Sequence, residues 1–279
     1  LDYHKTMEEY FKAKCILFEN SKNIIINADD EYGRRIAQQY KNSERNAVTF
    51  SLKDDSADCT AKNIQLSGTG SKFIMVSCGS INRVEFSMPG EYSVQNAIGS
   101  ALACQYLGFD IAEICENMKN IKGVKGRCEV LVKEPFTVIC DYAHTPDGLQ
   151  NICETLNACK VGRLVTVFGC GGDRDPIKRP IMGEIGVKLS DIAIITSDNP
   201  RTEDPMAIIE DILKGVKQEY GEYIVMEDRR AAIRYAMDIA KKDDIIVLAG
   251  KGHETYQEIH GKKNHLDERE EVAAHLQEL

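Results

Sequence analysis

The sequence predicts an α/β protein with two domains, the second of which is built on a parallel sheet. Short apolar runs alternate with segments of helical period throughout the second half of the chain. These runs are rich in Val and Ile and apolar on both faces, which is typical of buried parallel strands joined by crossover helices. A stretch with two glycines and several basic residues, at 121–131, is the best candidate for a domain junction. We therefore expect the boundary between the two domains within this stretch.

The first half predicts helices and a meander of short strands. Apolar residues at helical or alternating spacing define each element. The elements expected there, in chain order, are a helix at 6–19, a strand at 23–27, a helix within "NADDEYGRRIAQQY", short strands across 46–88, and helices at 93–107 and 110–118.

The second half predicts five strands, each followed by a helix or a loop. The expected strands lie at 136–140, 164–168, 192–196, 223–226 and 245–249. The expected helices lie at 147–158, 177–189, 205–218 and 228–241.

Composition narrows the class of protein. The chain has 279 residues, 43% of them hydrophobic, which is enough for two cores. Its net charge of −9 argues against a broad surface for nucleic acid or anionic membrane. No apolar run approaches the roughly 18 residues of a membrane span. Ten scattered cysteines without a C-x-x-C pattern predict reduced thiols in a cytoplasmic protein. Because the chain begins at Leu1 rather than Met, we expect it to be part of a longer protein.

Polar loops follow four of the five predicted strands. They are "DYAHTPD" (141–147), "GCGGDRD" (169–175), "SDNPRTED" (197–204) and "GKGHETY" (250–256). The carboxyl ends of parallel strands share one edge of a sheet, and ligands bind there. We therefore predict a ligand site at this edge.

Each loop also has a purely structural interpretation. Asp141 and Thr145 would cap the next helix, glycines would serve a turn, and Lys251 and His253 would be solvated. This interpretation does not explain why basic and acidic side chains converge on one edge of an acidic protein. A polyanion together with an amino acid would require such a set. The set comprises Arg174, Lys178, Arg179, Arg201, Lys251, Asp141, Asp198 and Glu254.

Two features of the first half also allow both a structural and a functional interpretation. Helical spacing places Lys14 within an apolar stripe formed by Met7, Tyr10, Phe11 and Phe18. From spacing alone, an amine that reaches the edge of the stripe is the simpler interpretation. After Pro89-Gly90, Gln95 and Asn96 either begin a helix or contact a planar base.

Seven stretches together resemble the Mur ligases, the amide ligases of peptidoglycan assembly. They are "LDYHKTMEEYFKAK", "INADDEYGRR", "GRCEV", "DYAHTPDGL", "VFGCGGDRDPIKRPIMG", "SDNPRTEDP" and "AGKGHETYQ". The resemblance covers nearly the whole chain and is most specific over 126–256. That family has a uridine-nucleotide domain, a central ATP domain with a P-loop, and a Rossmann-like third domain. This chain contains no G-x-x-x-x-G-K-[ST], so the resemblance implies part of the central domain at 1–124 and the complete third domain at 125–279.

The resemblance also implies roles for single residues in the nucleotide and metal sites. Lys14 matches a lysine that becomes a carbamate and holds Mg²⁺, and Arg127 matches an arginine that reaches the ATP phosphates. Asn96 matches an adenine contact, although its usual partner asparagine is Ser93 here. Asp141 matches the aspartate that binds the ribose, and His144 lies beside it.

A second group of residues matches the family's pocket for diaminopimelate. They are Arg174, Asp198, Asn199, Arg201, Gly250 and Glu254. Arg201 can bind the second carboxylate of diaminopimelate with two parallel hydrogen bonds, which lysine cannot accept. Asp198 and Glu254 suit the ammonium groups.

The function implied is an ATP- and Mg²⁺-dependent ligase that adds meso-diaminopimelate to UDP-MurNAc-L-Ala-D-Glu through an acyl phosphate. The chain is expected to be inactive alone, with neither nucleic acid nor membrane as a partner. A ligase for L-lysine and an amino-acid-binding lid without catalysis stay open. Folylpolyglutamate synthetase is a further alternative, and D-N-P-R together with "GKGHE" argues against it.

Overall fold

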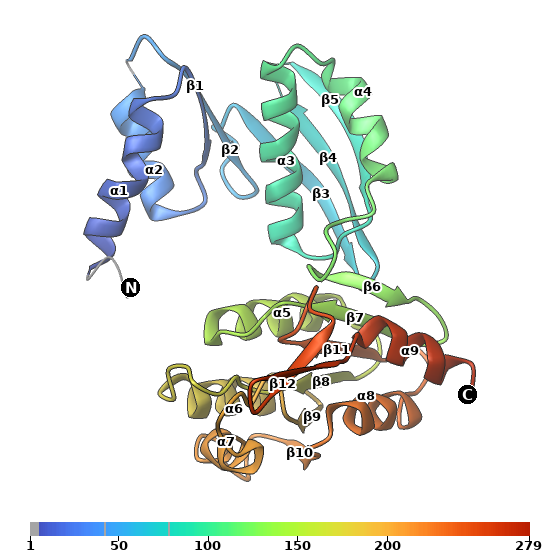
Figure 1. Cartoon of the computed structure of the whole chain (residues 1–279). Helices are drawn as coiled ribbons and strands as arrows, with labels where there is room; N and C mark the ends of the chain where they lie inside the picture. Colours follow the sequence, from blue (N-terminus) through green and yellow to red (C-terminus); the bar gives the residue numbers. More distant parts are fainter. Residues whose placement is uncertain (1–5, 42, 78) are drawn as a thin grey trace. The chain divides into compact units, whose positions relative to one another are not determined.

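The computed structural model describes residues 6–41, 43–77 and 79–279, which form two compact units (Figure 1). The first unit holds most of the chain up to Ile121. The second holds Lys122–Leu279 together with Leu66–Thr69 and Met88–Gly90. Because these short pieces interleave with the first unit, the boundary expected after residue 124 stays a prediction. None of the helices in the described ranges is long and apolar enough to cross a membrane.

A five-stranded sheet forms the centre of the first unit, in the order β1-β2-β3-β4-β5. The strands are β1 (Asn23–Asn27), β2 (Asn46–Ser51), β3 (Cys59–Ser67), β4 (Gly70–Ser77) and β5 (Ser80–Phe86). The meander predicted for 46–88 is correct for β4 and β5, which are antiparallel. It is wrong for β2 and β3, which pair in parallel at Phe50 and Ser51. The connecting loop returns the chain alongside β2, where the Asp58 carboxylate accepts hydrogen bonds from Thr49 N (2.8 Å) and Oγ1 (2.7 Å).

Three helices of the first unit begin at polar side chains that accept hydrogen bonds from the first turn. Thr6, Asp30 and Asp110 cap α1, α2 and α4 in this way. The helices are α1 (Met7–Glu19), α2 (Glu31–Tyr40), α3 (Glu91–Tyr106), α4 (Ile111–Asn117) and the 3₁₀ turn η1 (Met118–Asn120).

The apolar stripe predicted for the first helix is only partly correct. Phe11 and Phe18 pack on the core with Cys15, whereas Met7 is 45% exposed and Tyr10 is 39% exposed. Lys14 lies on this exposed side and not within an apolar face. The face of α1 that contacts the core runs through Phe11, Cys15 and Phe18, so Lys14 lies beside this face and not within it.

The second unit contains a six-stranded sheet in the order β10-β9-β8-β11-β7-β6. Its strands are β6 (Glu129–Val132), β7 (Thr137–Asp141), β8 (Leu164–Phe168), β9 (Ile192–Ile195), β10 (Glu222–Val225) and β11 (Ile245–Ala249). All neighbours are parallel except β6 and β7. The predicted α/β class with a parallel sheet in the second half is confirmed.

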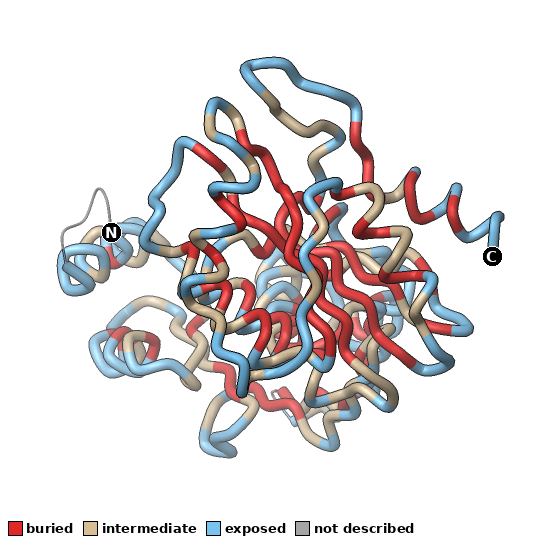
Figure 2. The backbone as a smooth tube through the Cα atoms, turned by 90° about the horizontal axis from the view of Figure 1, so that it is seen from below, coloured by how far each residue is buried: buried red, intermediate tan, exposed pale blue. Residues whose placement is uncertain are grey.

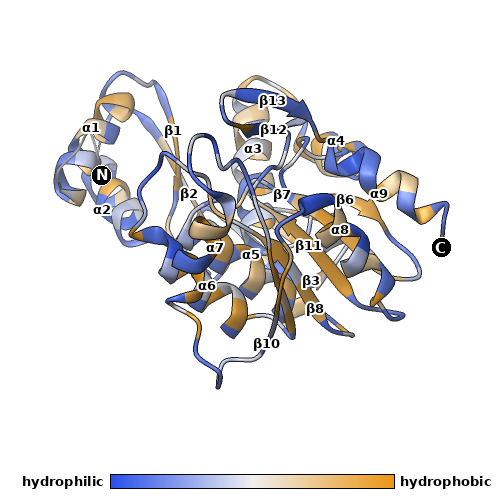
Figure 3. Ribbon diagram, turned by 60° about the horizontal axis from the view of Figure 1, so that its bottom comes forward, coloured by the Kyte–Doolittle hydropathy of each residue, from blue (hydrophilic) through white to orange (hydrophobic). Residues whose placement is uncertain are grey.

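Burial follows the position of each strand in the sheet. Every residue of β8, β9 and β11 is buried, and Figure 2 shows strands that are buried along their length. β8 and β11 are correspondingly hydrophobic in Figure 3. The prediction that 223–226 is apolar and buried on both faces is wrong. β10 lies at the edge of the sheet, so Tyr223 and Val225 are exposed.

Helices and a hairpin complete the second unit. The helices are α5 (Pro146–Cys159), α6 (Lys178–Lys188), α7 (Pro205–Leu213), α8 (Arg229–Asp238) and α9 (Glu268–Leu276). β12 (Tyr256–Ile259) and β13 (Lys262–His265) form an antiparallel hairpin, whose β13 is strongly hydrophilic in Figure 3. Neither this hairpin nor α9 was predicted from the sequence.

Candidate functional site

The loops after β8, β9 and β11 meet at one edge of the sheet. Gly172 N, after β8, donates to Asn199 O at 2.9 Å. Asn199 Nδ2, after β9, donates to Glu254 Oε2 at 2.8 Å. The carboxyl ends of three strands are therefore held to one another by direct hydrogen bonds.

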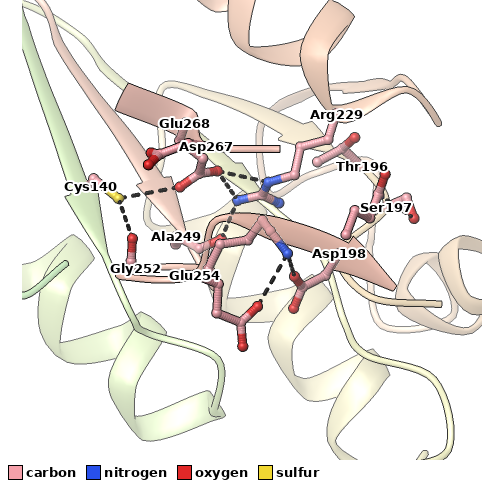
Figure 4. A network of polar contacts seen from close by, with 12 residues as sticks. Cys140, Thr196, Ser197, Asp198, Arg229, Ala249, Gly252, Glu254, Asp267 and Glu268 are labelled. Atoms are coloured by element: carbon pink, nitrogen blue, oxygen red, sulfur yellow. Dashed lines mark hydrogen bonds and ion pairs between the residues drawn. The ribbon is translucent and has the colours of Figure 1, made fainter. Parts of the chain in front are cut away.

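Lys251 lies at the centre of this junction and is 0% exposed. Its Nζ lies 3.1 Å from Asn199 Oδ1, 3.2 Å from Glu254 Oε2 and 3.5 Å from Asp198 Oδ1. Asp198 and Glu254 point toward the same amine in Figure 4. The interpretation of Lys251 as a solvated lysine is wrong, because a buried ammonium needs partners and finds them here.

Arg201 is fixed by its backbone and by its side chain. Its φ is +54°, and its N donates to Glu258 O at 2.9 Å. Its Nη1 donates to Gly172 O at 2.6 Å, and its Nε lies 3.7 Å from Glu258 Oε2. A Cβ at Gly171 would lie 2.8 Å from Nη1, so a larger residue there would displace the guanidinium. Since a guanidinium has five N–H donors, several stay available for a ligand carboxylate.

Two other basic residues of the predicted edge differ from each other. Arg174 is exposed and donates to the carbonyl of Asp173 at 3.1 Å. Arg179 is buried and binds Glu203 (2.8 Å) and Asp211 (2.9 Å). Its guanidinium lowers the pKa of Glu203. The prediction that Arg179 belongs to a ligand-binding charge set is therefore wrong, because its charge is used inside the fold.

Asp141 ends β7 and is held by the backbone. Its Oδ2 accepts a hydrogen bond from Cys128 N at 2.7 Å. Burial raises the pKa of Asp141, in spite of hydrogen bonds from the backbone of Cys128 and Ala143. Of the two caps suggested for the next helix, Thr145 is correct, since it accepts from Gly148 N. Asp141 therefore has another role than capping.

Aromatic rings gather beside Asp141. The Tyr142 ring lies 4.5 Å from the ring of His144 and 5.1 Å from that of His253. The Arg127 guanidinium lies 4.9 Å from the same ring. Gly126, with φ +71°, makes this approach possible, because a Cβ there would lie 2.2 Å from His253 N. Flat rings and a cation next to a carboxylate suit a nucleotide.

A second buried charge supports the loop after β11. Arg229 is 1% exposed; its Nε donates to Glu268 at 2.8 Å and its Nη2 donates to Ala249 O at 2.9 Å (Figure 4). The Cys140 Sγ lies 3.2 Å from the same carboxylate, and burial raises the pKa of this thiol well above its usual value. Sequence reasoning missed Arg229. Its helical spacing could have indicated that it is buried, because Arg229 lies on the same face of α8 as the buried residues Ala232, Ile233 and Ala236.

Two domain families match the sequence. The Mur ligase middle domain matches residues 1–104, and the Mur ligase glutamate ligase domain matches residues 126–252. The chain belongs to the Mur ligase family.

Individual Mur ligases show how much of the family's length this chain covers. It is 48% identical over 282 residues to UDP-N-acetylmuramoyl-L-alanyl-D-glutamate–2,6-diaminopimelate ligase 1 of Clostridium acetobutylicum, and 49% identical to the corresponding ligase of Clostridium tetani. Each alignment covers 100% of this chain and 57% of the relative. A solved structure of a ligase of that name is 36% identical, with a TM-score of 0.73 over 99% of this chain and 57% of its own. The chain thus spans little more than half the length of these Mur ligases.

Two of the predicted Mur-ligase positions, Lys14 and Asn96, lie in the first unit. Lys14 Nζ lies 5.3 Å from the Tyr10 ring on the exposed side of α1. Asn96 is exposed in the first turns of α3, Ser93 is buried, and Gln95 donates to Asp29 at 3.3 Å. Within residues 6–41, 43–77 and 79–279, no group of three or more His, Cys, Asp or Glu side chains could hold a metal ion.

Proposed function

We propose that the protein to which this chain belongs is an ATP-dependent amide ligase. Its substrates would be meso-diaminopimelate and UDP-MurNAc-L-Ala-D-Glu, in the cytoplasmic stage of peptidoglycan synthesis. The observation that supports this most is the pairing of charges at one sheet edge. The Arg201 guanidinium and the carboxylates of Asp198 and Glu254 provide both signs of charge that an amino acid with an extra carboxylate requires. The relatives that carry diaminopimelate in their names match this chain over its whole length.

Diaminopimelate is favoured over lysine by the state of Arg201. Its side chain is 21% exposed and is paired only loosely with Glu258, at 3.7 Å. A second carboxylate on the substrate would complete this pairing with a bidentate contact. Lysine would leave the guanidinium without that partner, which costs binding energy. L-Lysine is the alternative substrate.

The proposed reaction has two steps. The γ-phosphoryl group of ATP passes to the glutamate carboxylate, which gives an acyl phosphate and ADP. The neutral amine of diaminopimelate then attacks the acyl carbon, the C–O bond to phosphate breaks, and the nitrogen loses a proton. Positioning and charge neutralisation account for most of such catalysis.

The residues of this chain would serve binding in that reaction. Asp141 would accept hydrogen bonds from the ribose, beside the rings of Tyr142 and His144, and Arg127 would approach the phosphates. Asn96 would contact adenine.

Magnesium would neutralise phosphate charge when bound. Within residues 6–41, 43–77 and 79–279, no group of three or more His, Cys, Asp or Glu side chains could hold the ion, and Lys14, as a carbamate, would offer one oxygen ligand. We therefore assign no step to the metal and propose Lys14 as one ligand among others. Arg174 and Gly250 would complete the diaminopimelate pocket.

The deciding experiment measures amide formation by the complete enzyme with radiolabelled diaminopimelate or L-lysine. We expect product with diaminopimelate and little with lysine. The 279-residue chain alone should form no product, because its sequence contains no P-loop pattern. Equal use of both amino acids would contradict the proposed specificity. Binding of diaminopimelate without turnover in the complete enzyme would favour the non-catalytic lid.

A further inference from the structure

We propose that Lys251 is a positioning residue, whose buried ammonium holds the amino-acid pocket in its binding geometry. This inference rests on the proposed function. Lys251 follows β11 directly and reaches three oxygen atoms that belong to Asp198, Asn199 and Glu254. We call these three residues the ammonium cluster. A lysine ammonium has three donors, so each oxygen can receive one N–H.

The ammonium cluster depends on a cation for its geometry. Asp198 comes from the loop after β9, and Glu254 from the loop after β11. Two carboxylates that face one site repel each other unless a positive charge lies between them. Lys251 supplies this charge from inside the fold, with Nζ 3.5 Å from one carboxylate and 3.2 Å from the other. It therefore determines how far apart the two loops lie before any ligand binds.

Lys251 also sets the charge that remains for a ligand. The carboxylates of Asp198 and Glu254 together with the Lys251 ammonium carry one net negative charge. The neighbouring Arg229 does not alter this balance, because it is paired with Glu268 at 2.7 Å. Each carboxylate oxygen can accept more than one hydrogen bond. The cluster can thus neutralise one further ammonium group, which matches the single amino group at one end of diaminopimelate.

Hydrogen bonds link the same lysine to the carboxylate-binding side. Asn199 Oδ1 accepts from Lys251 Nζ and also from Glu258 N at 2.9 Å. Glu258 in turn accepts from Arg201 N at 2.9 Å. Loss of the Lys251 ammonium would therefore disturb Arg201 as well as the ammonium cluster, without direct contact between Lys251 and the substrate.

The first test uses Lys251→Ala in the complete enzyme. We expect the KM for diaminopimelate to rise at least about tenfold, the size typical of a lost hydrogen bond to a charged group. The KM for ATP should change less than about twofold, since the nucleotide residues lie outside this hydrogen-bond set. n-Propylammonium replaces the three methylenes and the amine that alanine lacks, so it should restore the KM. n-Propanol has no cation and should not.

A second test needs no substrate, so it separates this inference from the proposed function. Thermal unfolding of the 279-residue chain is followed by circular dichroism. Lys251→Ala should lower the Tm, and n-propylammonium should raise the Tm of this variant but not that of the wild type. Lys251→Met keeps the length of the side chain without its charge and should show the same rise in KM if the alanine variant does not fold. Lys262→Ala, on the exposed strand β13, is the matched control and should leave both quantities unchanged.

The kinetic test and the thermal unfolding test can fail independently of each other. If the wild-type enzyme does not use diaminopimelate, the proposed function fails and the thermal test alone decides the role of Lys251. A folded Lys251→Met enzyme with wild-type KM for diaminopimelate would overturn the inference. So would a Lys251→Ala chain whose Tm does not respond to n-propylammonium.

Discussion

At the scale of single residues, buried charges connect the ends of strands in the second unit. Lys251 joins the loops after β9 and β11 through Asp198 and Glu254. Arg229 joins α8 to α9 through Glu268 and to the end of β11 through Ala249 O. A buried charge is costly unless it is paired and hydrogen-bonded. These contacts therefore fix the loop conformations on which ligand binding would depend.

Arg201→Lys tests the proposed contact with the second carboxylate. Lysine keeps the positive charge but loses the planar group that binds a carboxylate with two hydrogen bonds. We expect the variant of the complete enzyme to bind diaminopimelate more weakly by about 1.5–3 kcal/mol, which would appear as a higher KM for diaminopimelate. The KM for ATP should stay near the wild-type value. Steady-state kinetics with each substrate varied in turn measures both. A variant that keeps the wild-type preference for diaminopimelate over lysine would show that Arg201 does not determine specificity.

Arg229→Met tests the buried ion pair. The change leaves the Glu268 carboxylate buried without its cation, so we expect the free energy of unfolding to fall by about 3–5 kcal/mol. The double variant Arg229→Met/Glu268→Leu removes both charges and should be more stable than the single variant. Urea unfolding followed by circular dichroism measures both, with Lys262→Met on the exposed strand β13 as a control of less than about 0.5 kcal/mol. A double variant less stable than the single one would show that the charge of Glu268 is not the cause.

The sequence predicted the residues of the site better than their partners. Asp198 and Glu254 were expected at one edge from strand ends, and Asn199 from the resemblance to Mur ligases; the structure brings the three together. Lys251 and Arg179 were not understood, because burial and long-range pairing decide their roles and neither is visible in local spacing. Arg179 binds Asp211, which belongs to another helix. What each site residue binds stays a prediction.

At the scale of elements, the local sequence identifies helices and strands well where one pattern acts alone. The Val- and Ile-rich runs of β8, β9 and β11 are buried as predicted, because both faces of a central strand are covered. β10 carries a similar pattern, but its place at the sheet edge leaves it exposed. Strand order depends on contacts between distant segments, so the sequence of one strand cannot reveal it.

Asp244→Asn tests a contact that joins three elements of the second unit. Asp244 accepts from Arg163 N (2.7 Å), Arg163 Nη2 (2.6 Å) and Lys241 N (2.9 Å), and Arg163 also donates to Ile239 O at the end of α8. Burial would raise the pKa of Asp244, but the hydrogen bonds and charge of Arg163 outweigh it and hold the pKa below its usual value. We expect the variant to lose about 2–4 kcal/mol of unfolding free energy at pH 7.

The pH dependence of that loss identifies its cause. A carboxylate with a lowered folded-state pKa stabilises the fold above its unfolded pKa of about 3.9 and loses this effect as pH falls through the folded value. The difference between wild type and Asp244→Asn should therefore be complete above about pH 5 and shrink below about pH 4. Urea unfolding at pH 7, 5 and 3.5 measures it. A difference that is constant down to pH 3.5 would mean that packing, and not charge, is responsible.

At the scale of the whole molecule, the chain consists of two units with separate cores. The first has a mixed five-stranded sheet, and the second a six-stranded sheet with helices and a hairpin. Apolar side chains of the second core come from β6, β7, β8, β9, β11, α8 and α9, all within Lys122–Leu279. A domain of ordinary size with its own core can fold alone.

The final prediction is that residues 122–279 fold without the rest of the chain. The charge contacts that fix the proposed pocket, between Lys251 and Asp198 and between Arg229 and Glu268, are both contained in this segment. We expect its circular dichroism to show helices and strands and its urea unfolding to be a single cooperative transition. Lys251→Met should lower the midpoint of that transition in the fragment as much as in the 279-residue chain. If the fragment gives no cooperative transition, its core needs Leu66–Thr69 or Met88–Gly90, the two pieces contributed from earlier in the chain.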